Sequence, residues 1–130
     1  MPARLLQWFD LKSAIIGAVL MASIIGLINS GHGVMLALTA AGKQGAYTFF
    51  FAGLIMQHCR WLATFRLRPW LAIAIATIWP TMVTVVLVYT LHSFKGTPEP
   101  EWSSVPPGVL GGLSFFLISR TLVLEATAAD

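Results

Sequence analysis

An uncharged apolar run from Ser13 to Ile28 is the feature that most constrains how this chain can fold. With its flanks, the run supplies most of the roughly 20 residues that a helix needs to cross a bilayer. Every fourth residue is small, and on a helix such residues share one face, where a second helix can pack closely. The residues of this face are Ala14, Ala18, Ala22, Gly26 and Ser30. The run therefore predicts a transmembrane helix with a close-packing face.

The composition extends this prediction to the whole chain. Of its 130 residues, 57% are hydrophobic and 10% are charged, whereas about 25% of the residues of a soluble domain are charged. Little chain lies outside the apolar runs, so no separate soluble domain is expected. We predict an all-α polytopic membrane protein, a single membrane domain over 1–130 that forms a bundle of four transmembrane helices. The predicted spans are about 13–30, 46–63, 70–91 and 106–123.

Glycine and proline predict where the helices are interrupted. A single helix over 13–41 would be about 44 Å long, longer than the bilayer core is thick, so we expect a break at Gly31 to Gly33. Residues 34–41 are then predicted to lie at the interface or to re-enter the membrane, ending at Gly42 to Gly45. Ser13 is the predicted N-cap of the first span. The hydrophilic segment 92–107 is expected to be an exposed loop, and Gly108 with Gly112 forms a second close-packing pair.

The basic residues predict the topology. With both termini on the cytoplasmic side, that side carries six basic residues and the other side two, which satisfies the positive-inside rule. The six are Arg4, Lys12, Arg60, Arg66, Arg68 and Arg120, and the two are Lys43 and Lys95. The expected location is a bacterial plasma (inner) membrane. The two halves share an order of span, outer segment and span, which would fit two parallel two-helix repeats, although any small hairpin protein shares part of this plan.

One polar cluster adjoins the predicted membrane region and is the candidate ligand-binding site. It consists of Asn29, Ser30, His32, Lys43, Gln44 and Tyr47. Polar groups at membrane depth usually face a cavity, a substrate or another helix, so the cluster could form a pocket or gate for an anionic group, with Lys43 supplying the charge. The alternative interpretation is a glycine-terminated helix end followed by a lysine that snorkels to the interface.

Other classes of function find little support in the sequence. It contains no motif for nucleotide binding, nucleophilic catalysis or zinc hydrolysis, which counts against an enzyme. The single cysteine, Cys59, excludes an internal disulfide and a cysteine metal cluster, and neither a metal nor a cofactor is predicted. No carboxylate lies inside a predicted span, which argues against a proton-coupled carrier that uses one. The net charge of +3 is better explained by contact with anionic membrane lipids than by nucleic acid.

Two functions remain open at this stage. The first is a transport-type protein in which a homo-oligomer forms a path or groove for a small solute, an ion or a lipid headgroup. The second is a non-catalytic accessory or assembly subunit of a larger membrane complex, which packs on its partner through the small-residue faces. Polar residues should line a continuous cavity in the first and should merely cap helices in the second.

Overall fold

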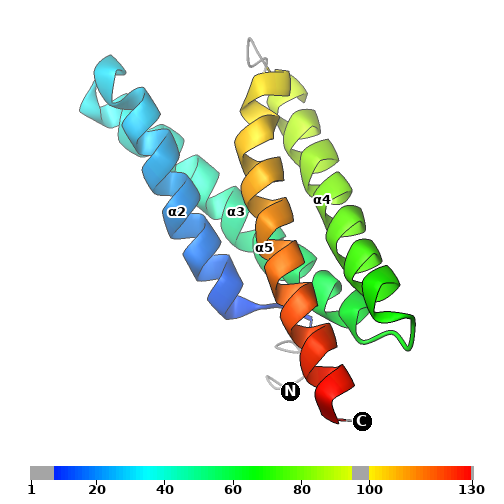
Figure 1. Ribbon diagram of the computed structural model, residues 1–130. Helices are drawn as coiled ribbons and strands as arrows, with labels where there is room; N and C mark the ends of the chain where they lie inside the picture. The colour runs from blue at the N-terminus through cyan, green and yellow to red at the C-terminus, as the bar shows by residue number, and fades with distance from the viewer. Residues whose placement is uncertain (1–7, 95–99, 130) are drawn as a thin grey trace. The chain divides into compact units, whose positions relative to one another are not determined.

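A computed structural model describes residues 8–94 and 100–129 of the chain, with the backbone alone at His92 and 100–103. Over these residues the protein is helical and contains no strand (Figure 1). The elements are α2 (Leu11–Asn29), the 3-10 turn η1 (Ser30–His32), α3 (Val34–Ala63), α4 (Pro69–Phe94) and α5 (Pro100–Ala129). The all-helical fold predicted from the sequence is confirmed.

Three stretches of helix are long and apolar enough to cross a membrane, namely Leu11–His32, Pro69–Leu91 and Ser104–Ala129. Large apolar side chains remain exposed along them; Leu27, for example, keeps 74% of its surface accessible. Lipid is the solvent in which such a surface is stable, because hydrocarbon is as apolar as the side chains themselves. The described helices therefore support a membrane location for this chain.

α3 is a single helix of 30 residues, which corrects the prediction of a short segment that ends at Gly42 to Gly45. The glycines stay helical, and Gly45 lies against α2. A Cβ atom on Gly45 would be 3.2 Å from Cβ of Ala22 and 3.5 Å from the carbonyl oxygen of Ala18. Gly45 thus allows two helices to approach closely instead of ending one. Because polar residues such as Lys43 and Gln57 interrupt its apolar sequence, α3 is not among the three span candidates.

The chain forms two compact units, Met1–Gln57 and His58–Asp130, and α3 contributes to both. In the first unit, α2 and the beginning of α3 form a hairpin that reverses at η1 (Figure 1). Gly33 follows η1 with a φ of 103°, a left-handed conformation that glycine adopts at little cost. The predicted break at Gly31 to Gly33 is confirmed.

α2 begins at Leu11, and its N-cap is Asp10, so the prediction of Ser13 as the cap is wrong. The carboxylate of Asp10 accepts a hydrogen bond of 3.0 Å from the backbone N–H of Ser13. The backbone N–H of Asp10 in turn donates to the carbonyl oxygen of Gly53 at 3.0 Å. The ring of Phe9 covers Gly53 so closely that a Cβ atom there would collide with it. The start of α2 is therefore tied to α3 by backbone and side chain together.

In the second unit, α4 and α5 lie side by side as an antiparallel pair (Figure 1). Glycines of α5 meet side chains of α4: a Cβ atom on Gly108 would lie 2.7 Å from Cγ2 of Val85, and one on Gly112 would lie 3.1 Å from Oγ1 of Thr81. One hydroxyl pair joins the helices, Thr77 Oγ1 with Ser119 Oγ at 3.2 Å.

The helices extend into the segment 92–107, which corrects the prediction of a loop over that whole range. α4 continues to Phe94, and α5 already begins at Pro100. Proline is favoured as the first residue of a helix because its missing N–H would have no partner there. Residues 95–99, including Lys95 of the charge count, lie outside the described residues, as does Arg4.

Candidate functional site

Asn29 and Ser30 lie at the end of α2, and both side chains bond to the backbone of that helix. Asn29 Nδ2 donates to the carbonyl oxygen of Ile25 at 2.8 Å, and Ser30 Oγ donates to the carbonyl oxygen of Leu27 at 2.8 Å. Both bonds are local ones near the end of the helix, and the carbonyl oxygen of Leu27 also accepts from the backbone N–H of Ser30. The geometry of this pair is that of helix capping.

His32 is exposed in the turn between α2 and α3, one residue before the left-handed Gly33. The helix that follows the turn carries Lys43, nine residues after Val34. At 1.5 Å per residue, this separation corresponds to about 13 Å along the axis of α3. The six residues of the predicted cluster therefore fall into two groups, one at the turn and one further along α3.

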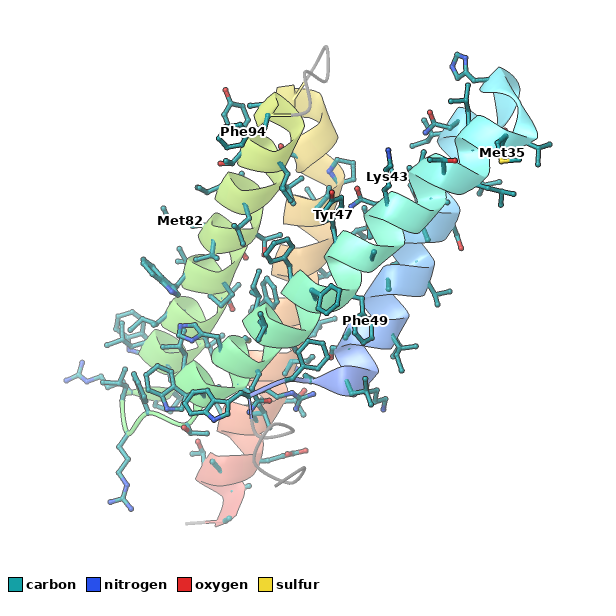
Figure 2. The ribbon with its side chains drawn as sticks, turned by 180° about the vertical axis from the view of Figure 1, so that it is seen from behind. Met35, Lys43, Tyr47, Phe49, Met82 and Phe94 are labelled. Carbon is teal, nitrogen blue, oxygen red and sulfur yellow. The ribbon has the colours of Figure 1, made fainter. Side chains whose placement is uncertain are left out.

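The second group lies on α3 and consists of Lys43, Gln44 and, one turn later, Tyr47. Figure 2 shows Lys43 and Tyr47 one turn apart on the same helix, well removed from Met35 next to the turn. Gln44 Nε2 donates to Thr48 Oγ1 at 3.3 Å. Thr48 itself contacts α2 at Gly17, so the amide of Gln44 is attached to the seam of the hairpin. Lys43 is exposed, and Tyr47 is partly buried.

The register of the hairpin fixes the depth of Lys43. Gly45 packs against Ala22, and a Cβ atom on Gly26 would lie 3.4 Å from Cβ of Ala41. Lys43, midway between Ala41 and Gly45, is therefore level with the middle of the stretch from Ala22 to Gly26. That level is about eight residues, or about 12 Å, from the His32 end of the first span candidate. If α2 crosses the membrane, Lys43 lies within the hydrocarbon layer.

The charge of Lys43 has no carboxylate nearby in the sequence to neutralise it. No aspartate or glutamate occurs between Leu11 and Phe94. An unpaired lysine near the middle of a span costs about 3 kcal/mol on insertion scales, and snorkelling recovers part of this cost. Such a residue usually faces the interior of a bundle or a water-filled cavity.

The predicted packing residues lie at several helix contacts. In α2, Ala22 and Gly26 meet α3, Ala14 is buried, the backbone of Ala18 lies against Gly45, and Ser30 bonds to its own helix. In α5, Gly108 and Gly112 meet α4.

Sequence reasoning missed the other side of these contacts. Gly17 and Gly45 contribute to the α2–α3 seam, and Gly53 accommodates Phe9. The sequence did contain a signal for these contacts: Gly45 and Gly53 are eight residues apart on one helix, and residues at that spacing share a helix face. The Thr77–Ser119 pair had no local signal, since 42 residues separate the two hydroxyls.

Comparisons with protein-family models, curated proteins and solved structures gave no significant match for this chain.

Proposed function

We propose that this chain is a transport-type membrane protein whose oligomer provides a polar path or groove for a small anionic solute, an ion or a lipid headgroup. The observation that carries the proposal is the position of Lys43 in the α2–α3 hairpin, level with the middle of the stretch from Ala22 to Gly26. A lysine at that level requires water, a ligand or a polar surface from another subunit. A purely space-filling subunit would have no use for the charge.

The proposal includes four membrane crossings, with α3 as the additional one. α2 and α3 contact each other from Gly26 and Ala41 at one end to Gly17 and Ala52 further along. Contact with α2 over this length supports a crossing of the same layer by α3. α3 can be less apolar than the other spans because one of its faces meets α2 instead of lipid. Four crossings put both termini on one side, in agreement with the distribution of lysine and arginine.

The surroundings of Lys43 support the proposal of an oligomer. Glycine, alanine and threonine are in close contact at the described points of the seam, so a ligand is not expected between the two helices. Lys43 is exposed on the hairpin, so a polar environment at its depth has to come from outside the hairpin. A second copy of the chain that presents the same face would surround a shared path with lysine and tyrosine side chains.

Cysteine accessibility in reconstituted vesicles tests the proposal. In a Cys59→Ser background, Lys43→Cys should react with a water-soluble thiol reagent, because a polar path admits water to that depth. Ser23→Cys, which lies at nearly the same level on α2, is the matched control and should react at least tenfold more slowly.

Anion flux in the same vesicles is the second test. Lys43→Gln should lower chloride or phosphate flux by about tenfold, equivalent to about 1.4 kcal/mol of lost attraction.

Two results would contradict the proposal. Lack of reaction at position 43 would show that the site is dry, and flux equal to that of protein-free vesicles for the wild type would remove the transport function. In the second case an accessory role, in which Lys43 meets a partner subunit, would take its place.

A further inference from the structure

The turn between α3 and α4 is short and held by hydrogen bonds. The backbone N–H of Thr64 donates to the carbonyl oxygen of Trp61 at 3.1 Å, and the N–H of Phe65 donates to that of Leu62 at 3.2 Å. The hydroxyl of Thr64 bonds to the same Trp61 carbonyl at 2.7 Å. After the turn, the N–H of Leu71 bonds to the carbonyl oxygen of Arg68 at 2.9 Å. These bonds give the turn a defined backbone, so its side chains project from fixed positions.

Aromatic side chains gather around this turn and remain accessible. The rings of His58 and Trp61 lie 5.4 Å apart, and those of Trp61 and Phe65 meet edge to face at 4.7 Å. Trp61 nevertheless keeps 54% of its surface exposed and Trp70 keeps 64%. Exposed tryptophans at the end of a span are typical of the membrane interface, where an amphipathic ring can sit between headgroups and hydrocarbon.

Two arginines complete the surface. Arg66 and Arg68 are exposed within the turn, three residues and one residue, respectively, before the span candidate that starts at Pro69. No acidic residue lies between Leu11 and Phe94 that could neutralise them from a neighbouring position in the chain. We name this surface the basic turn, which consists of Trp61, Phe65, Arg66, Arg68 and Trp70.

We propose that the basic turn binds the headgroup of an anionic phospholipid. The guanidinium groups of Arg66 and Arg68 suit a phosphodiester, because each offers a planar fork of donors to phosphate oxygens. The neighbouring tryptophan and phenylalanine rings suit the glycerol and upper acyl region of the same lipid. A soluble anion would use the arginines alone, so the combination of charge and exposed aromatic surface selects a lipid. This site is independent of Lys43 and of the transport proposed above.

The test is a titration of the detergent-solubilised full chain with short-chain phosphatidylglycerol, and with phosphatidylcholine as the neutral counterpart. The wild type should bind phosphatidylglycerol more tightly. Arg66→Gln and Arg68→Gln should each weaken this binding about fivefold and leave phosphatidylcholine binding unchanged. Trp61→Leu should weaken binding of both lipids, because the ring contacts the part that they share.

Lys12→Gln is the matched control, since Lys12 is also an exposed basic residue at the start of a span candidate but is not part of the basic turn. It should change the affinity less than twofold. Helix content and melting temperature in neutral detergent verify that each variant is folded. Equal losses for Lys12→Gln and the two arginine variants would reduce the site to general charge attraction and overturn the proposal. Equal affinity of the wild type for both lipids would overturn it as well, as would self-association that is lost in Arg66→Gln, because a second copy would then occupy the surface.

Discussion

The two hairpins of this protein achieve close helix packing by different means. In the α2–α3 hairpin, the seam consists mainly of glycine and alanine, as where Gly45 meets Ala22. In the α4–α5 hairpin, glycines of one helix face threonine and valine side chains of the other, and a hydroxyl pair crosses the seam. Lipid offers no hydrophobic force that would drive helices together, so both seams depend on close contact. The second adds a hydrogen bond between side chains within the seam, whereas the bond described above for the first, from Asp10 to Gly53, joins backbone groups at the start of α2.

The α4–α5 seam has fewer hydrogen bonds between its helices than the number of threonines in α4 would indicate. Thr81 and Thr84 donate their hydroxyl protons to carbonyl oxygens of their own helix, those of Thr77 and Pro80, at 2.7 and 2.8 Å. Among the described side chains of this seam, Thr77 is the threonine whose hydroxyl bonds to α5. Both hairpins should therefore be most sensitive to added volume and less sensitive to the loss of a hydroxyl.

The largest effect is expected from volume added to the glycine and alanine seam. Gly45→Leu should lower the free energy of unfolding by about 3 kcal/mol, because its side chain has to displace Ala22 and the backbone of Ala18. Gly42→Leu is the control on the same helix, since a Cβ atom at Gly42 meets nothing within 4 Å. Unfolding in a denaturing detergent measures both. Equal stability of the two variants would show that the α2–α3 contact is not formed in the folded protein.

An intermediate effect should distinguish neighbouring glycines of α5. A Cβ atom on Gly111 would have ordinary contacts, the nearest at 3.5 Å, whereas one on Gly112 would press on Thr81 at 3.1 Å. Gly111→Ala should raise the melting temperature, since alanine is favoured over glycine in a helix by up to about 1 kcal/mol. Gly112→Ala should lose this gain and lower the melting temperature. A lower melting temperature for Gly111→Ala than for Gly112→Ala would show that Gly111, and not Gly112, makes the tighter contact with α4.

The smallest effect concerns the hydroxyl pair. A double-mutant cycle with Thr77→Val and Ser119→Ala should give a coupling energy of about 0.6 kcal/mol, the average for hydrogen bonds between membrane helices. Ser119 also bonds to the carbonyl oxygen of Phe116 at 3.1 Å, which the cycle separates from the bond between the helices. A coupling energy near zero would show that the hydroxyl pair adds nothing to the stability that close contact gives the α4–α5 seam.

Hydropathy and residue spacing predicted the helices better than their ends. The apolar runs indicated all-helical structure, and Gly31 and Gly33 indicated the break, because a longer helix would exceed the bilayer. The continuity of α3 could not be predicted, since Gly45 looks like a helix breaker until Ala22 is seen opposite to it. Helix ends were misplaced for a related reason. Asp10 and Ser13 are both good caps by residue type, and only the backbone conformation decides between them.

The candidate site shows the same limit. Residue type and sequence proximity grouped Asn29, Ser30 and His32 with Lys43, but the hairpin separates the turn from Lys43 by about 13 Å along α3. The depth of Lys43 depends on which residues of α2 face which residues of α3. No local sequence pattern predicts this pairing. A glycine and alanine pattern on both helices indicates that they can pack closely, whereas the contacts of Gly26 and Gly45 show where.

The compact reversal at Ser30 to Gly33 also bears on how the protein enters its membrane. Nascent membrane helices can insert as hairpins, in which case the connecting segment has to be carried through the apolar layer first. Here that segment contains a single ionisable side chain, His32, and the polar groups of Asn29 and Ser30 already bond to carbonyl oxygens of α2. In the proposed topology, in which α3 returns across the membrane, the connecting segment would therefore carry little uncompensated polarity through the apolar layer. In that topology, the turn that ends α2 would allow the α2–α3 hairpin to cross the bilayer as one unit during biogenesis.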